Sequence, residues 1–199
     1  MFKKPAETAT PIIDALAERW SGRAYDPDRS IDRHALLSVL EAARWTPSCF
    51  GYQPWRLLIW DRRQADGPWQ HAFACLAESN RAWARQAPIL MLACADRQFA
   101  DGRPNRWAHY DTGAALMSLS VQATALGLMV HQMGGFNAEQ ARTAFAIPER
   151  FDCLTMITLG YQLERASIPA VLQEREHAPR ARRPLGELFF ANAWDQPVE

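Results

Sequence analysis

The fold of this chain is decided by the stretch Pro47-Ser48-Cys49-Phe50-Gly51-Tyr52-Gln53-Pro54-Trp55-Arg56. A helical pattern precedes it, and an apolar, strand-like run at residues 57–60 follows it. Two prolines bracket a turn that contains a glycine and several small or polar side chains, and such residues end helices and fix loops. The stretch therefore predicts a fixed loop whose backbone N–H and C=O groups are free to bind the rim of a flat heterocycle.

Outward from this loop, helical and strand-like patterns alternate along the chain. We expect helices at residues 11–21, 31–46, 68–85, 109–127, 137–146 and 169–176, and strands at residues 56–60, 88–95, 128–132 and 151–159. Thr10 is the expected N-cap of the first helix, and Asn137 with Gln140 predicts a capping box. The helix at 109–127 is apolar almost all round, so we expect it to be buried, whereas the polar segment 96–106 predicts a mobile loop. This alternation indicates an α+β or α/β domain.

Bulk composition narrows the function classes. The chain has 199 residues, of which 48% are hydrophobic, and it includes 8 Trp and 9 Phe, so we expect a single packed domain over residues 1–199. Its 22 basic and 22 acidic side chains give a formal net charge of zero. Neither nucleic acid nor a membrane surface is therefore an expected partner. An anion site must come from a local cluster of arginines.

Several catalytic and metal-binding patterns are missing from the sequence. The four cysteines form no C-x-x-C pair and the five histidines show no zinc-binding spacing, so no metal site is expected. There is no G-x-G-x-x-G, no P-loop and no G-x-S-x-G elbow. The first residues contain no apolar signal segment, and the longest apolar run, 89–95, is too short to span a bilayer. We therefore expect a cytoplasmic protein.

Two arginine clusters stand near opposite ends of the chain. The first is Arg19-Trp20-Ser21-Gly22-Arg23, and the second is Arg180-Ala181-Arg182-Arg183. Guanidinium groups bind phosphate in a bidentate fashion, and two or more of them neutralise its dianion. On charge alone, two solvated surface patches are the favoured interpretation of these clusters.

A further motif is His131-Gln132-Met133-Gly134-Gly135-Phe136. Its two glycines permit a close approach of the main chain to a planar ligand. A backbone N–H in this position is suited to stabilise negative charge that develops on such a ligand. An ordinary Gly-Gly turn before a capped helix would explain the same residues nearly as well.

Together these four segments resemble the FMN-dependent nitroreductase family. The resemblance rests on the Pro-Ser turn that continues into Gln-Pro-Trp, the early Arg-x-Ser-x-Arg pattern, the late basic pair and the H-x-M-x-G-F pattern, and it covers about residues 10–190. It implies an α/β/α sandwich of the α+β class, with a mixed, mostly antiparallel sheet flanked by helices. It also implies an intertwined homodimer in which a C-terminal arm, about residues 184–199, packs on the partner subunit.

The resemblance also implies an FMN site. Its phosphate and ribityl chain would contact Arg19, Ser21, Arg23, Arg180 and Arg182; the pyrimidine edge of its ring would face Pro47, Ser48, Cys49, Gly51 and Gln53; and Gly134 and Gly135 would lie near flavin N5. The family often has Asn where this chain has Gly51. No side chain is expected to act as a catalytic acid or base.

The implied activity is hydride transfer from NAD(P)H through flavin to a nitroaromatic, quinone or related small-molecule acceptor in a ping-pong mechanism. We expect the acceptor to contact Phe50 and Tyr52, which lie in the loop at residues 47–53, and Trp107, which directly follows the segment 96–106. Open alternatives are a specialised flavin enzyme (a dehalogenase, a ring dehydrogenase or a flavin-consuming enzyme), a non-catalytic flavin-binding dimer and a flavin-free phosphate-binding domain. The sequence leaves the natural acceptor, the oxygen sensitivity and the choice between NADH and NADPH open.

Overall fold

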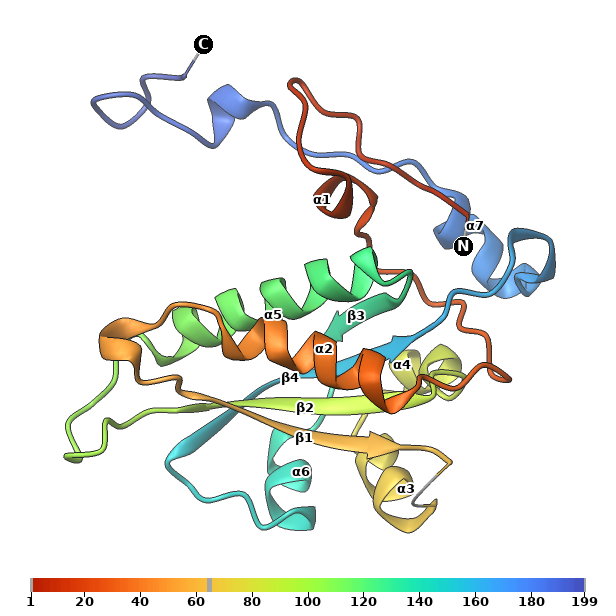
Figure 1. The fold of residues 1–199 in the computed structure, drawn as a ribbon, viewed down its shortest axis with the longest axis horizontal. Coiled ribbons are helices and arrows are strands. Elements are labelled where there is room, and N and C mark those ends of the chain that lie inside the picture. Colours follow the sequence, from red (N-terminus) through yellow and green to blue (C-terminus); the bar gives the residue numbers. More distant parts are fainter. Residues whose placement is uncertain (1, 64–65, 199) are drawn as a thin grey trace.

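The computed structural model describes residues 2–63 and 66–198. A four-stranded sheet in the order β1-β2-β4-β3 lies at its centre (Figure 1). The strands are β1 (Trp55–Asp61), β2 (Ile89–Asp96), β3 (Met129–Met133) and β4 (Phe151–Gly160). All three pairings between neighbouring strands are antiparallel. The α+β class is confirmed, and the four described strands contain none of the parallel pairing that a mixed sheet allows.

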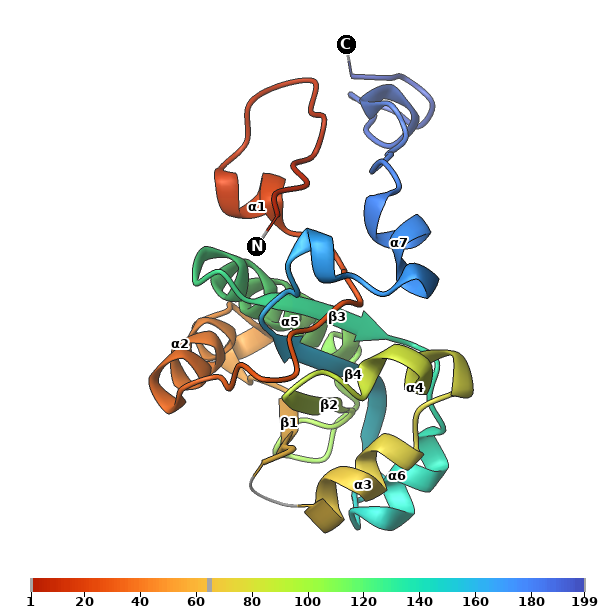
Figure 2. The same ribbon diagram turned by 90° about the vertical axis from the view of Figure 1, so that its right-hand side faces the viewer.

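Helices cover both faces of the sheet, as Figures 1 and 2 show. α2 (Arg33–Arg44) and α5 (Ala108–Ala125) lie on one face, and α3 (Asp66–Ala74), α4 (Glu78–Ala84) and α6 (Ala138–Ala144) lie on the other. Every residue of β2 is buried. Because side chains alternate along a strand, Met91 and Ala93 pack toward α2 and α5, while Leu90 and Leu92 pack into the opposite core. A sandwich with helices on both faces results.

Two predicted helix starts are confirmed by their capping bonds. The Asp32 carboxylate accepts a hydrogen bond from the Ala35 N–H at 2.8 Å, and α2 begins at the next residue after this cap. The Asn137 side-chain oxygen accepts from the Gln140 N–H at 2.9 Å at the start of α6. Short polar side chains that satisfy the first N–H groups of a helix explain both positions.

Two other helix predictions are wrong. Thr10 caps nothing, because α1 covers only Asp14–Glu18 and its N-cap residue, Ile13, makes no side-chain cap bond. The expected helix at 68–85 is divided into α3 and α4. At the break, the Ala77 N–H donates to the Gly135 carbonyl and the Cys75 carbonyl accepts from the Asn137 N–H. This pairing with the chain after β3 replaces helical hydrogen bonds, and local periodicity carries no signal of it.

The two ends of the chain lie on the same side of the molecule, beyond α5 and β3 (Figure 2). α7 (Ala170–His177) and the 3-10 turns η2 (Arg165–Ser167) and η3 (Leu185–Glu187) belong to this C-terminal part. Beyond residue 184 the tail extends away from the sheet. Its apolar side chains remain exposed, namely Leu185, Leu188, Phe189, Trp194 and Val198.

α5 departs from its predicted burial. Its inner face packs on the sheet, but Met117 is 41% exposed and Gly113 is exposed as well. With Ile13 (65% exposed) and Leu16 from α1, this outer face borders an apolar depression of about 510 Å³. Within one chain the helix is therefore covered on one side only. In residues 2–63 and 66–198, no helix combines the length and the apolar character that crossing a membrane requires.

Candidate functional site

The two arginine clusters come together in the folded chain. Arg19 is the C-cap residue of α1, and Arg180 and Arg182 follow α7. Burial and then the nearby Arg182 charge lower the pKa of Arg19, while burial and then the Arg19 and Arg182 charges lower the pKa of Arg180. Like charges so placed repel one another. The three guanidinium groups thus form a cationic cluster that an anion would stabilise.

Neighbouring groups hold this cluster in place. The Arg180 guanidinium donates to the carbonyls of Lys4 (2.8 Å) and Ala17, which ties the C-terminal segment to the N-terminal one. Arg19 Nη1 donates to Ser21 Oγ at 3.5 Å. In the described part of the chain, none of Arg19, Arg23, Arg180 and Arg182 forms an ion pair with a carboxylate.

Arg23 lies on another side of the same segment. Its guanidinium carbon is 5.8 Å from the ring centroid of Trp83 in α4. Burial and then the Arg175 charge lower its pKa, whereas Glu176 raises it. Arg23 is thus half-buried between α4 and α7, and the segment 19–23 bridges the body of the protein and the C-terminal part.

His131 is a residue of this site that sequence reasoning missed. Its Nδ1 donates to the Gly22 carbonyl at 3.1 Å, and its ring packs on Trp83 with 4.6 Å between centroids. Burial lowers its pKa to about 4 against the hydrogen bond to Gly22, and the Arg23 and Arg19 charges lower it further. A neutral imidazole therefore holds the arginine segment against β3. The histidine is the first residue of the H-x-M-x-G-F pattern, whose glycines alone carried a predicted role.

This histidine predicts a pH dependence of stability. The pKa of His131 is about 4 in the folded chain and about 6.5 as the ordinary value, so the folded state binds fewer protons between these limits. The contribution of His131 to the free energy of unfolding is therefore complete above pH 6.5 and is lost as the pH falls toward 4. The difference between the two pKa values corresponds to about 3 kcal/mol. We expect His131→Gln to flatten the dependence of Tm on pH between 4 and 6.5. Wild-type and variant profiles that stay parallel in this window would contradict the assignment.

Strand β3 connects the cluster with the predicted Gly-Gly segment. Gly134 directly follows β3 and is three residues beyond His131, a span of about 10 Å along a strand. Gly134 and Gly135 line a depression of about 940 Å³ whose other walls come from residues 74–78, Arg81 and residues 136–140. A side chain at Gly134 would meet no atom within 4 Å, so the backbone borders open space there. The edge strand β3 therefore contacts the segment at Gly22 through His131 and ends directly before the two glycines.

Gly135 differs from its neighbour. Its carbonyl accepts hydrogen bonds from the Ala77 N–H and from Asn80 Nδ2, both at 2.9 Å. A Cβ at this position would come within 2.8 Å of Asn80 Nδ2. Close packing against α4 thus explains the second glycine without a ligand, whereas the open side of Gly134 has no such explanation.

The loop at residues 47–53 lies apart from the cluster. Figure 1 shows η1 (Cys49–Gly51) at one end of the α2 and α5 layer, whereas α7 and the segment after α1 lie beyond the other end. Pro47 and Gln53 are exposed, and Ser48 and Cys49 are half-buried. One chain thus brings the two arginine clusters together but does not bring this loop to them.

Part of the loop backbone is already paired, contrary to the sequence-based expectation. The Ser48 hydroxyl accepts from the Gln53 N–H at 2.9 Å, and the Asp111 carboxylate of α5 accepts from the Cys49 N–H at 3.0 Å. Phe50 has a φ of 53° and is 87% exposed, and Gly51 has a φ of 66°. Left-handed backbone is unusual for phenylalanine, so these bonds fix a strained turn that presents an aromatic ring to solvent.

Aromatic side chains join this loop to the segment 96–106. The Phe99 ring centroid is 6.0 Å from that of Phe50 and 5.2 Å from that of Tyr52. The Tyr52 hydroxyl donates to the buried Asp96 carboxylate at 3.2 Å. Trp107 lines a depression of about 300 Å³ together with residues 47–49, Tyr110 and Asp111. The three side chains that are predicted to contact the acceptor therefore lie in or beside the loop at residues 47–53. The segment 96–106 packs against the same loop through Phe99.

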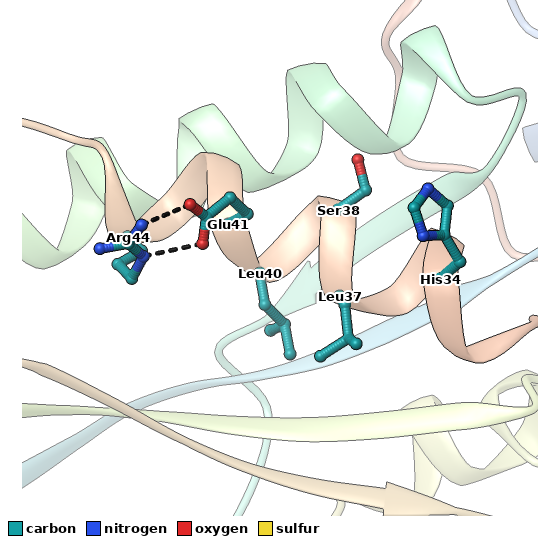
Figure 3. Close-up of a pocket in the computed structure, with 6 residues that line it drawn as sticks. All are labelled: His34, Leu37, Ser38, Leu40, Glu41 and Arg44. Atoms are coloured by element: carbon teal, nitrogen blue, oxygen red, sulfur yellow. Dashed lines mark hydrogen bonds and ion pairs between the residues drawn. The ribbon is translucent and has the colours of Figure 1, made fainter.

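A separate depression of about 550 Å³ follows the outer surface of α2 (Figure 3). It is lined by His34, Leu37, Ser38, Leu40, Glu41 and Arg44. Arg44 Nε donates to Glu41 at 2.7 Å, so its charge is already paired. No residue with a predicted cofactor role borders this surface. We therefore place the candidate site at the β3 edge and not here.

Comparison with known proteins supplies the family. The sequence model of the nitroreductase family matches residues 16–161. This chain belongs to the nitroreductase family. Among its relatives, an uncharacterized 15.4 kDa protein of Mycolicibacterium smegmatis is 33% identical over 125 residues, which cover 63% of this chain and 84% of that protein. A putative NADH dehydrogenase/NAD(P)H nitroreductase of Methanothermobacter thermautotrophicus is 26% identical over 159 residues, 77% of this chain and 78% of its own.

Solved structures share the fold of this chain. An oxidoreductase containing FMN is 30% identical, with a TM-score of 0.87 over 94% of this chain and 95% of that chain. A putative nitroreductase in complex with FMN from Desulfovibrio desulfuricans is 26% identical, with a TM-score of 0.72 over 94% of this chain and 99% of that chain. The agreement extends over nearly the whole length of the chain.

Proposed function

We propose that this nitroreductase-family protein is an FMN-dependent oxidoreductase that takes a hydride from NAD(P)H and reduces a nitroaromatic, quinone or related acceptor. The observation that carries the proposal is the cationic cluster of Arg19, Arg180 and Arg182, whose N-terminal segment is held at Gly22 by His131 of β3, three residues before Gly134. Two solved relatives are described as containing FMN or as a complex with FMN. Two relatives are named NAD(P)H nitroreductase or NAD(P)H-flavin oxidoreductase.

The residues at the β3 edge fit a flavin mononucleotide. A phosphate dianion would offset the mutual repulsion of the guanidinium groups, and their planar forks match its oxygens. Ser21 and Arg23 would hold the phosphate and the ribityl chain. Gly134, whose backbone borders open space, would hold the reactive edge of the ring. Guanidinium groups, a hydroxyl and a free backbone edge are the donors that a phosphorylated, planar heterocycle requires.

Bound FMN supplies hydride transfer at N5, so the chain needs no acid–base side chain of its own. The task of this chain is to position the cofactor and to tune its environment. The neutral His131 adds no charge beside the phosphate and fixes the backbone at Gly22. Bulky aromatic side chains around residues 47–52 would border the exposed face of the flavin, where the donor and the acceptor would bind in turn.

We further propose that the site is completed in a homodimer. Within one chain, the loop that carries Pro47, Ser48, Cys49, Gly51 and Gln53 lies apart from the arginines. The uncovered apolar face of α1 and α5 and the exposed apolar tail at 184–198 favour a second copy that covers both. In such a dimer the loop of the partner subunit would approach the flavin ring. Sedimentation of the holoprotein tests this, with a mass of two chains expected.

Anaerobic half-reactions test the activity. We expect NADH or NADPH to bleach the flavin absorbance in one step, and a quinone or nitroaromatic added after removal of the nucleotide to restore it. Initial rates with both substrates varied should give the parallel lines of a ping-pong mechanism. A flavin that is bound but reduced by neither nucleotide would contradict the enzyme and favour a flavin-binding dimer. Loss of the flavin itself during turnover would instead indicate a flavin-consuming enzyme.

Replacement of Trp107 tests the acceptor surface. Because an aromatic pair contributes about 0.5–1.5 kcal/mol beyond area burial, we expect Trp107→Ala to raise the KM for aromatic acceptors by about 2- to 10-fold. Retention of FMN should not change. Trp45→Ala is the control, since Trp45 is also surface-exposed (74%, against 40% for Trp107) but lies on Arg44 at the end of α2. Equal acceptor kinetics in both variants would remove Trp107 from the site.

A further inference from the structure

Glu176 is a buried carboxylate that the proposed activity does not use. It lies in the last turn of α7 and is 1% exposed, although glutamate is almost never fully buried unless it is paired. One carboxylate oxygen, Oε1, accepts the Arg23 N–H at 2.7 Å. The other, Oε2, has no hydrogen-bond partner among the described residues. Burial raises the pKa of this carboxyl against the nearby N–H groups of Arg23 and Ala24 and the positive charges of Lys4 and Arg23.

The free oxygen lies against the backbone of the arginine segment. A Cβ at Gly22 would come 3.2 Å from Glu176 Oε2 and 3.1 Å from the Trp20 ring, and would also meet Met129 Sδ. Only glycine fits this close approach. The Gly22 carbonyl is held from the other side by His131. The peptide units between Ser21 and Arg23 are therefore fixed between β3 and α7.

The same residue also joins the ends of the chain. Lys4 Nζ donates to the Glu176 carbonyl at 2.9 Å, and Arg180, four residues farther along, donates to the Lys4 carbonyl at 2.8 Å. α7 thus contacts the first arginine cluster directly and is linked to Arg180 of the second through Lys4. A shift of its last turn would move the Arg23 backbone and the chain that carries Arg180 and Arg182.

We propose that Glu176 is a positioning residue for the phosphate-binding segment. It holds the Arg23 N–H through Oε1, and so sets the direction of the backbone between Ser21 and Arg23 relative to the guanidinium cluster. Glu176 acts through this segment and touches no reacting atom. The inference rests on the proposed FMN site.

Comparison of FMN with riboflavin separates this role from a general effect on folding. The two ligands share the ring and the ribityl chain, and only FMN carries the phosphate. We expect Glu176→Ala to raise the Kd of FMN about ten-fold and the Kd of riboflavin less than two-fold, as measured by quenching of flavin fluorescence. Glu176→Gln keeps an oxygen acceptor for the Arg23 N–H, so its FMN Kd should stay within about three-fold of wild type. Glu174→Ala, at an exposed position of the same helix, is the control.

The outcomes are distinct. If Glu176→Ala changes both Kd values by the same factor, or changes neither, the positioning role is wrong while the FMN site stands. If the wild-type protein binds FMN no more tightly than riboflavin, the proposed phosphate site fails and this inference with it. Should the alanine variant not fold, Glu176→Asp serves instead. Its shorter side chain withdraws the acceptor, so the same preferential loss of FMN is expected, and an unchanged ratio of the two Kd values would overturn the proposal.

Discussion

Replacement of Arg19 by alanine is expected to weaken FMN binding by about 10- to 100-fold. Hydrogen bonds to charged groups contribute about 1.5–3 kcal/mol each, and every 1.4 kcal/mol corresponds to a factor of ten. Arg19 is the suitable target because its side chain holds only Ser21 Oγ, whereas Arg180 also fastens the N-terminal segment. Isothermal titration of the apoprotein with FMN measures the effect.

The matched control is Arg33→Ala. Arg33 is an exposed arginine at the first position of α2, away from the cluster, and its loss removes the same charge from the protein. If the two variants lose the same amount of FMN affinity, the effect of Arg19→Ala would come from net charge alone and not from a contact with the phosphate. High salt should also weaken the wild-type interaction, since exposed parts of the cluster are screened. An Arg19→Ala protein that keeps wild-type affinity would remove the N-terminal arginines from the phosphate site.

The second large effect is expected on stability, from Arg150→Ala. Asp96 is 0% exposed, and Arg150 Nη2 donates to its Oδ2 at 2.6 Å. Without Arg150, the carboxylate keeps only the Tyr52 hydroxyl and the Gln98 N–H, both at 3.2 Å. Removal of one partner leaves a buried charge uncompensated, and because Arg150 is itself half-exposed we expect a loss of about 2–3 kcal/mol in the free energy of unfolding. Urea denaturation followed by fluorescence measures it.

Arg44→Ala provides the comparison for this ion pair. Arg44 and Glu41 are both exposed on α2, so the loss of their pair should cost less than about 1 kcal/mol. Because Asp96 holds Tyr52, the Arg150 variant should also loosen the loop at residues 47–53 and raise the KM for acceptors. A change in unfolding free energy no larger than that of Arg44→Ala would show that the buried carboxylate needs no cation.

Much of the fold was readable from local patterns. The buried strand at 88–95, the helix start near residue 31, the cap at Asn137 and the long helix before Gly127 depend on neighbours in sequence, and the structure contains them. The break between α3 and α4 depends instead on pairing of Ala77 with Gly135, 58 residues away. The outer face of α5 had the same apolar composition as its inner face, so the sequence alone did not indicate which face one chain covers.

The candidate site also contains residues that local sequence patterns predict and residues that only the fold reveals. The arginines were found because charge in clusters is visible in a neutral chain, and their convergence is a property of the fold. His131 and Glu176 were not found, because a buried histidine and a buried glutamate look like surface residues until their contacts with Gly22 and Arg23 are known. The loop at residues 47–53 was identified by resemblance, and its distance from the arginines in one chain gave the reason to propose a second subunit.

The most direct test of the account is the absorption spectrum of the freshly purified protein, followed by release and identification of any yellow chromophore. The account predicts a flavin spectrum, with FMN and not FAD released at close to one molecule per chain. A colourless protein that also fails to take up added FMN would contradict the assignment of the arginine cluster and favour a flavin-free domain that binds another phosphate.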